Sequence, residues 1–346
     1  MARIAAVATA VPSYRLDQAE AARLASILFD RDVSEIERLL PAFGNAGIDS
    51  RYACVPTEWY FEPHGWRERN ALYVENALQL GVEAILRCLA QAGCATEDID
   101  GIVVVSTTGI ATPSLDALLI ERLKLRRDIQ RLPVFGLGCA GGVLGLAPAA
   151  AMATEGRNIL FVVIELCSLT FRHGDNSKSN IIASALFGDG AAALLLRGDA
   201  ACRSTDPAVG ASGSHTWPGS LDIMGWNVEN DGLGVMFSRD IPTLLRRNLR
   251  AATDRFLAGH NLSRSLLAGY ICHPGGSKVI AALEDAFELQ PGRLDDARAV
   301  LRDYGNMSAA TVLFVLARQI ARGLCGRWLM TALGPGFTAG FQLLEA

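Results

Sequence analysis

The sequence predicts an α/β protein built from two similar halves, and two observations support this fold class. Strand-like apolar runs alternate with helical patterns along the 346 residues, which is typical of buried sheets covered by helices. Two segments also repeat the same elements in the same order. Because half of the residues are hydrophobic, the chain is able to bury a large core.

The first elements follow from the apolar pattern. The opening run Ile4 to Val11 is interpreted as a strand rather than a signal peptide, because it is short, alanine-rich and stopped by Pro12. Helical spacing over residues 70–92 ends at Gly93, and residues 100–106 follow as a buried strand. A second helix is expected from about Ser114.

The repeat places Cys139 and Asn306 at equivalent positions. In each case a helix follows, then a glycine (Gly156 or Gly323) that lies 17 residues after the polar residue, and then a strand. The helices end near residues 154 and 321, and the strands cover residues 158–166 and 327–333. The turn at Thr107 precedes Cys139 by 32 residues, and the turn at His273 precedes Asn306 by 33 residues. We therefore predict two similar halves, residues 1–205 with the thiol and residues 206–346 with the histidine and asparagine.

Composition excludes several classes of protein. With 32 Lys and Arg against 36 Asp and Glu, the chain lacks the basic field of nucleic-acid binders, so no nucleic-acid partner is expected. It contains no uninterrupted apolar run of about 18 residues, and a cytoplasmic location is expected. The eight cysteines show no zinc spacing, so we expect no metal and reduced thiols, most of them structural.

Cys139 is the candidate nucleophile. It lies in the sequence GLGCAGG, residues 136–142, between a strand and the start of a helix. Glycines allow a tight turn there, and the helix dipole favours the thiolate form. A buried structural cysteine is the alternative interpretation.

The same glycines also fit a dinucleotide-binding pattern. Gly136, Gly138 and Gly141 give G-x-G-x-x-G between a strand and a helix, and Glu165 ends the next strand. Two features speak against this interpretation: the motif lies past residue 130, and the thiol occupies the turn that a pyrophosphate would approach.

His273 and Asn306 complete a candidate site. His273 lies between a strand and Pro274-Gly275-Gly276, and Asn306 is flanked by Gly305 and Ser308. A structural histidine and a simple helix cap are the alternatives, but the repeat predicts that both turns face Cys139. Papain-like proteases also use Cys, His and Asn, although their cysteine lies near the mature N-terminus.

Several motifs together resemble the type III polyketide synthases, the chalcone synthase-like enzymes of the thiolase superfamily, in their bacterial form. The resemblance covers nearly the whole chain. The motifs are GLGCAGG around Cys139, ALFGDGAAA over 185–193, MGW with GLGVMFSRDIP over 224–242, CHPGG over 272–276, YGNMSAA over 304–310 and LGPG over 333–336.

The resemblance implies a duplicated αβαβα layered fold, a homodimer, and repeated condensation of malonyl-CoA onto an acyl-CoA starter without a carrier protein. Cys139 would carry the acyl group, and His273 would hold it as a thiolate. His273 and Asn306 would then stabilise the enolate formed as CO₂ leaves. No cofactor is implied, because decarboxylation itself generates the carbanion.

The resemblance also assigns residues around the substrate. Phe187 matches the gatekeeper phenylalanine, and Val235 stands where plant enzymes have a second one. Trp226 replaces a glycine. The positions that line the cavity are Thr107, Cys167, Thr170, Trp226, Val235 and Ser308. For the CoA moiety the matching positions are Arg38, Gly275 and Gly276, while Pro41 and Asn45 stand where plant enzymes carry cations.

The expected reaction uses a fatty acyl-CoA starter and gives alkylpyrones or alkylresorcinols, because Val235 opens the pocket and Trp226 narrows it. The alternative is a malonyl-only or aromatic-starter synthase with a phloroglucinol, tetrahydroxynaphthalene or chalcone-type product. Two other classes of protein are disfavoured. A carrier-protein-dependent ketoacyl synthase would have a second histidine at Asn306, and a non-catalytic acyl-CoA-binding homologue need not keep all three catalytic residues.

Overall fold

The structure is a computed structural model that describes residues 1–29, 40–154, 156–198, 203 and 205–346. The first half contains the following strands and helices: β1 (Arg3–Ala10), α4 (Trp66–Ala92), β4 (Gly101–Val105), α5 (Leu115–Leu123), β5 (Gln130–Val134), α6 (Gly141–Leu144), α7 (Leu146–Met152), β6 (Asn158–Leu166) and β7 (Asp189–Arg197). The second half contains β8 (Ala208–Thr216), α9 (Ile241–Ala258), β11 (Gly269–Cys272), α10 (Ser277–Phe287), α11 (Asp295–Tyr304), α12 (Thr311–Ala321), β12 (Arg327–Gly334) and β13 (Thr338–Glu345).

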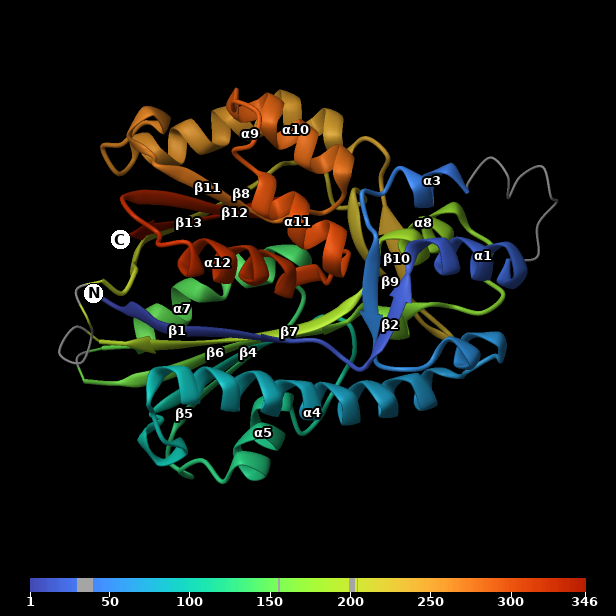
Figure 1. Ribbon diagram of the computed structural model, residues 1–346, viewed down its shortest axis with the longest axis horizontal. Coiled ribbons are helices and arrows are strands. Elements are labelled where there is room, and N and C mark those ends of the chain that lie inside the picture. Colours follow the sequence, from blue (N-terminus) through green and yellow to red (C-terminus); the bar gives the residue numbers. More distant parts are fainter. Residues whose placement is uncertain (30–39, 155, 199–202, 204) are drawn as a thin grey trace.

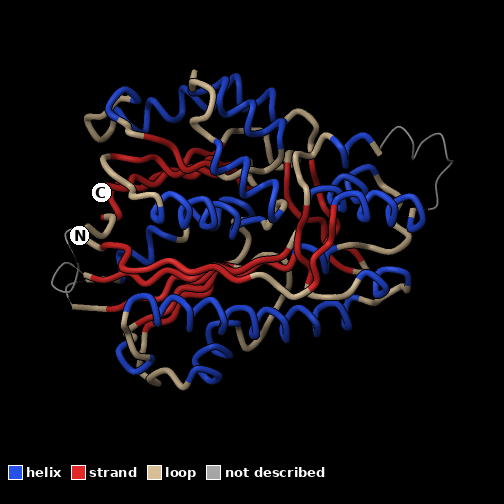
Figure 2. Tube along the Cα trace, viewed as in Figure 1, coloured by secondary structure: helices blue, strands red, loops and turns tan. Residues whose placement is uncertain are grey.

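These elements form five layers (Figure 1). Helices α9 and α10 cover one sheet, α4 and α5 cover the other, and α7 and α12 lie between the two sheets. The tube view shows the same succession of helical and extended layers (Figure 2). The predicted αβαβα fold is therefore confirmed.

The strand topology repeats between the halves. The nine strands follow the order β11-β12-β13-β8-β1-β7-β6-β4-β5, and the parts from the two halves join where Arg3 of β1 pairs with Ala208 of β8. In each half two parallel strands, β4 and β6 or β11 and β12, are followed by an antiparallel strand, β7 or β13. Strands β1 and β8 lie antiparallel to β7 and β13. Because the topology repeats, the turns after β4 and β11 occupy equivalent places.

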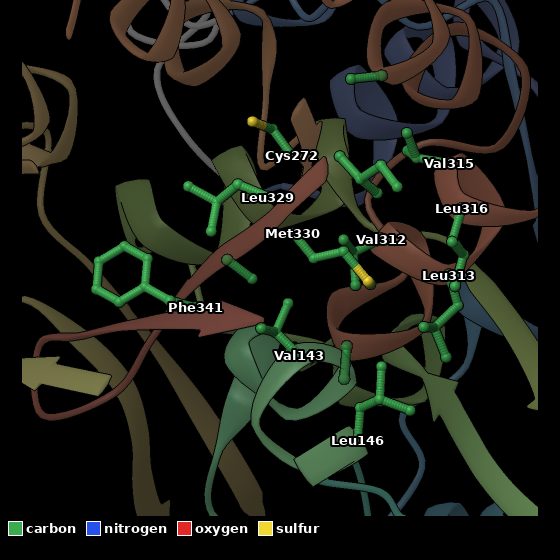
Figure 3. Packing of buried hydrophobic residues seen from close by; sticks show 14 of the residues in the cluster. Val143, Leu146, Cys272, Val312, Leu313, Val315, Leu316, Leu329, Met330 and Phe341 are labelled. Atoms are coloured by element: carbon green, nitrogen blue, oxygen red, sulfur yellow. The ribbon is translucent and has the colours of Figure 1, made fainter. Parts of the chain in front are cut away.

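The middle layer forms the core on which the site rests (Figure 3). Val143 of α6 and Val312 of α12 lie beside Leu329 and Met330 of β12, and all four side chains are fully buried. A Cβ atom on Gly142 would lie only 2.2 Å from the carbonyl oxygen of Ala309. The absence of a side chain at this glycine therefore allows the two halves to touch directly beneath the site.

Local sequence explains the element boundaries. Helix α4 ends at Gly93, whose φ of 57° is the left-handed conformation that glycine adopts readily. The helix predicted after Cys139 is divided into a 3₁₀ turn, α6 and α7. Pro148 in α7 has no amide hydrogen to donate to the carbonyl group of Leu144, which weakens a continuous helix at that point.

Two two-stranded sheets, β2-β3 and β9-β10, and three helices lie at the side of the molecule away from both termini (Figure 1). Their bounds are β2 (Tyr14–Asp17), β3 (Ser50–Ala53), β9 (Met224–Glu229), β10 (Gly232–Phe237), α1 (Gln18–Leu28), α3 (Pro41–Gly44) and α8 (Lys178–Leu186). Strands β9 and β10 form a hairpin, whereas α1 and α3 lie between β2 and β3 in the sequence. These elements supply walls for the cavities described below.

Candidate active site

Cys139 lies in the 3₁₀ turn Gly138–Ala140 between β5 and α6. Gly138 has a φ of 49°, and a Cβ atom there would lie 2.5 Å from Cδ of Pro335. Both the backbone conformation and the close contact therefore require glycine. Cys139 is 8% exposed and lines a cavity.

The dinucleotide interpretation of these glycines is wrong, because protein atoms fill the space. Pro335 occupies the position next to Gly138, and Val105 and Ala309 occupy the position next to Gly141. A pyrophosphate has no room against this turn. The glycines serve the packing of the two halves instead.

The surroundings of the Cys139 thiol have opposing effects on its acidity. The pKa of Cys139 is raised to about 12, mainly by burial and to a lesser extent by the nearby carboxyl group of Glu165. The hydroxyl group of Ser308, whose Oγ lies 3.6 Å from Sγ, lowers the pKa by hydrogen bonding. Ser308 comes from the second half of the chain, in the turn before α12.

His273 follows β11, and its backbone N–H donates to the carbonyl group of Thr331. Burial lowers the pKa of its imidazole to about 4. Neither ring nitrogen has a hydrogen-bond partner among the described residues, Cys139 and Asn306 included. Burial favours the neutral forms of both the thiol and the imidazole, and the imidazole nitrogens are available to bind a substrate.

Asn306 is fully buried and its amide group is oriented by two contacts. Its Nδ2 donates to the carbonyl oxygen of Gly275 at 3.2 Å, and its Oδ1 accepts from the backbone N–H of Ser308 at 2.9 Å. The backbone N–H of Asn306 donates to Leu186, and Gly188 donates to the carbonyl group of Asn306. These bonds attach Asn306 to the segment around Phe187, which lies in the other half.

Glu165 is a buried carboxyl group near the thiol whose role the sequence did not suggest. It accepts hydrogen bonds from the backbone N–H of Thr107 at 3.0 Å and from Oγ1 of Thr107 at 2.8 Å. Burial raises the pKa of Glu165 to about 7. The protonated and ionised forms of the Glu165 carboxyl group are therefore both populated near neutral pH.

A cavity of about 40 Å³ lies above Cys139. The structure brings six of the seven predicted substrate positions to its walls, namely Thr107, Cys167, Phe187, Trp226, Val235 and Ser308. The ring of Phe187 packs 6.4 Å from that of Trp226 and 6.0 Å from that of Phe237. The wall residues that sequence reasoning missed are Gly138, Met224, Gly225, Met236, Phe237 and Pro335. All six lie within the motifs that carry the resemblance, so the motifs were the signal that could have found them.

A second, mostly apolar cavity of about 80 Å³ adjoins the first. The two share Cys167, Phe187 and Val235, and Thr170, the seventh predicted substrate position, lines only this second cavity. Its other walls are Leu16, Ala21, Leu24, Ala25, Leu28, Phe29, Arg51, Tyr52, Ala53, Tyr60, Ser168, Phe171, Asn180, Ala183 and Ser184. We call it the apolar cavity.

A surface groove of about 630 Å³ leads toward the site, and we call it the basic groove. Phe237 lines both the groove and the cavity above Cys139. Gly275 and Gly276 lie along the groove together with Pro41 and Asn45. Arg38, the other predicted CoA position, lies outside the described residues.

No group of three or more His, Cys, Asp and Glu side chains among the described residues is placed to hold a metal ion. None of the described helices combines the length and the hydropathy needed to cross a membrane.

Comparison with known proteins identifies relatives along the whole chain. Residues 60–200 match the family model of the chalcone and stilbene synthase N-terminal domain, and residues 211–344 match that of the C-terminal domain. A Bacillus subtilis protein whose name assigns it to the chalcone synthases is 39% identical, with 100% of this chain and 99% of the relative aligned. A 1,3,6,8-tetrahydroxynaphthalene synthase of Streptomyces peucetius is also 39% identical, over 99% of this chain and 92% of the relative.

Solved structures agree with this assignment. The 1,3,6,8-tetrahydroxynaphthalene synthase of Streptomyces coelicolor, described as a bacterial type III polyketide synthase, superimposes with a TM-score of 0.93 at 29% identity, covering 99% of each chain. PKS-I of the brown alga Ectocarpus siliculosus gives a TM-score of 0.93 at 28% identity, over 99% of this chain and 98% of the other.

Proposed function

Since the chain belongs to the chalcone and stilbene synthase family of type III polyketide synthases, acyltransferases that condense malonyl-CoA, we propose that Cys139 carries the growing acyl chain and that His273 and Asn306 activate the extender. The observation that carries this proposal is the convergence of the three turns. Cys139 and Ser308 are in contact, Asn306 orients the backbone of Ser308, and Asn306 also contacts Gly275 beside His273.

The proposed loading step begins with proton transfer from the Cys139 thiol to the imidazole of His273. Burial opposes a lone charge on either group, but an ion pair formed between them offsets part of both penalties. The thiolate then attacks the starter thioester, and the C–S bond to CoA breaks, so that CoA leaves as its thiol after taking up the proton.

The proposed extension step uses the same donors. As the C–C bond to the malonyl carboxylate breaks, CO₂ leaves and the electron pair forms an enolate whose oxygen accepts hydrogen bonds from Nδ2 of Asn306 and an imidazole N–H of His273. The enolate carbon attacks the thioester on Cys139 and expels the thiolate. Because decarboxylation supplies the carbanion, this chemistry needs no metal or redox cofactor. We also propose that the enzyme acts without a carrier protein, which an assay with the purified chain alone tests. We further propose that it assembles as a homodimer, which light scattering tests.

We propose a fatty acyl-CoA as the starter, because the apolar cavity gives an alkyl chain a place to lie. Cys167, Phe187 and Val235 form the boundary between this cavity and the space above Cys139. Each methylene group buried there would contribute about 0.8 kcal/mol, which corresponds to roughly fourfold in kcat/KM per methylene. The expected products are alkylpyrones or alkylresorcinols.

The test compares kcat/KM for acetyl-, hexanoyl-, lauroyl-, palmitoyl- and coumaroyl-CoA with malonyl-CoA as extender. An Ala25→Leu variant, which fills the apolar cavity from α1, should reduce the long-chain values and spare acetyl-CoA. Ala25 is buried and lines the cavity, whereas Ser26 is exposed on the same helix, so Ser26→Leu is the matched control. A preference for coumaroyl-CoA, or chain-length independence, would refute the fatty starter.

One observation favours a malonyl-only reaction as the second candidate. Arg51 is 2% exposed and lines the apolar cavity, and its Nε and Nη2 have no hydrogen-bond partner among the described residues. Burial lowers the pKa of Arg51 to about 10. A guanidinium group in that position suits the oxygen atoms of a polyketide chain better than an alkyl tail. Formation of a tetrahydroxynaphthalene or phloroglucinol from malonyl-CoA alone would support this candidate.

A further inference from the structure

We propose that Lys178 and Lys278, assisted by Arg239, bind the phosphate groups of the CoA thioesters at the mouth of the basic groove. The inference rests on the proposed function and assigns CoA-binding residues that neither the repeat nor the motifs predict. These cations would replace the positive charges that are missing at Pro41 and Asn45, which line the same groove.

The groove concentrates positive charge. Lysine occurs at only three positions of the sequence, 124, 178 and 278, and two of the three line this groove together with Arg239. No aspartate or glutamate is among the described residues of its lining. All three cationic side chains are exposed. Most arginines of the chain are paired with carboxylates, but none of these three makes an ion pair or side-chain hydrogen bond within the described part of the chain.

Helix geometry adds to this charge. Three helices of at least nine residues begin at the groove: α8 at Lys178, α9 at Ile241 and α10 at Ser277. The N-terminus of a helix carries a partial positive charge and free backbone N–H groups, which together favour phosphate. Three such ends around one concave surface therefore point to an anion with more than one phosphate group.

The groove also leads to the reacting groups. Gly275 lines it, and a Cβ atom on Gly275 would lie 3.6 Å from Nε2 of His273, an imidazole nitrogen that is buried and without a partner among the described residues. Phe237 lies at the junction with the cavity above Cys139. A ligand held by phosphates outside and by a thioester inside has the chemistry of CoA, in which a nucleotide carries a diphosphate and a 3′-phosphate.

The test uses charge removal at constant side-chain length. Lys178→Met and Lys278→Met should each lower kcat/KM for malonyl-CoA by about fivefold to tenfold, mainly through KM, since an exposed charge contact contributes modestly. Lys124→Met is the matched control, because Lys124 is exposed and directly follows α5, which lies at the far side of the molecule (Figure 1); this variant should leave kcat/KM unchanged. The double variant should also show a weaker dependence of KM on salt.

A second class of substrate distinguishes a loss of phosphate binding from a disturbance of the active site by the substitution. N-acetylcysteamine thioesters lack the nucleotide, so both variants should use them as well as the unmodified enzyme does. Equal losses with both substrate classes, or no loss with malonyl-CoA, would overturn the assignment. Binding of free CoA, measured by calorimetry, needs no turnover; it therefore tests the groove even if the proposed reaction fails.

Discussion

The Sγ atom of Cys139 lies 3.6 Å from the Oγ atom of Ser308, so a hydroxyl group of the second half holds the thiol of the first. Ser308 has a φ of 48°, an uncommon conformation for a residue other than glycine. Its backbone N–H donates to Oδ1 of Asn306. The same short turn therefore positions both the thiol and the amide that the proposed mechanism uses.

Replacing Ser308 by glycine should make the thiol less reactive. Glycine tolerates the positive φ, so the variant removes the hydroxyl group without backbone strain. Loss of a hydrogen bond that favours the thiolate raises the pKa of Cys139, and a change of about one unit would lower the alkylation rate near pH 8 about tenfold. Peptide mass spectrometry after iodoacetamide treatment measures this, with the exposed Cys325 as an internal reference. An unchanged ratio between the two cysteines would contradict the role of Ser308.

Cys139→Ala should abolish product formation and leave the fold intact. Alanine fits the small space of this turn, and the cost in the free energy of unfolding should be about 1 kcal/mol. Product analysis by mass spectrometry and a thermal melt followed by circular dichroism are the two measurements. Undiminished product from a folded variant would show that another group carries the acyl chain.

Asn306→Asp should stop decarboxylation while Cys139 is still loaded. The aspartate keeps an oxygen acceptor for the N–H of Ser308 but loses the donor Nδ2. Removal of one oxyanion donor costs about 10²–10³ in rate, so release of labelled CO₂ from malonyl-CoA should fall by that factor. Acylation of Cys139 by a starter-CoA, measured by intact mass, should persist. The opposite pattern, with loading lost and decarboxylation kept, would reverse the assigned roles.

Glu165→Gln should change how stability depends on pH. In the folded chain the pKa of Glu165 is raised to about 7, so between its usual pKa and 7 the folded state holds a proton that the unfolded state has lost. Stability therefore falls as pH rises through this window, and the loss remains above it. The glutamine has no such dependence, so the Tm of the variant relative to the unmodified chain should increase from pH 5 to pH 8. A constant difference across this range would show that Glu165 does not titrate there.

Gly142→Ala should destabilise the protein by about 1–3 kcal/mol or more, because the added Cβ would lie 2.2 Å from the carbonyl oxygen of Ala309. A backbone atom cannot move away as a flexible side chain can. Gly44→Ala is the matched control, since a Cβ there meets nothing within 4 Å and its φ is not in the positive range. Urea denaturation compares the two. Equal midpoints would mean that the halves are not closely packed at Gly142.

Much of the architecture could be predicted from the sequence, because apolar periodicity and glycine positions report directly on local structure. Strand β6 has the predicted bounds, Asn158 and Leu166, and α4 ends at the predicted glycine. The residues of the site were predictable because they follow strands in a repeated unit. Their roles in catalysis stay a prediction.

The walls of the cavities were harder to predict, for a physical reason. The apolar cavity is assembled from α1, β3, α8 and β10, and apolar residues such as Leu24 and Ala25 have the same helical spacing whether they face a cavity or a solid core. Contacts between side chains that come together only in the tertiary structure cannot be detected from the local hydrophobic periodicity of the sequence. The same holds for Lys178 and Lys278, 100 residues apart in the sequence.

The pairing of Val235 with Trp226 across the β9–β10 hairpin has a consequence for evolution. The two residues face one another on a ribbon that forms no backbone pairs with the nine-stranded array, so their exchange does not disturb the main sheets. A change at one of them alters the space left for the other, and selection acts on the pair. Relatives with different starters are therefore expected to differ at both positions together, while the glycines beneath Cys139 stay the same.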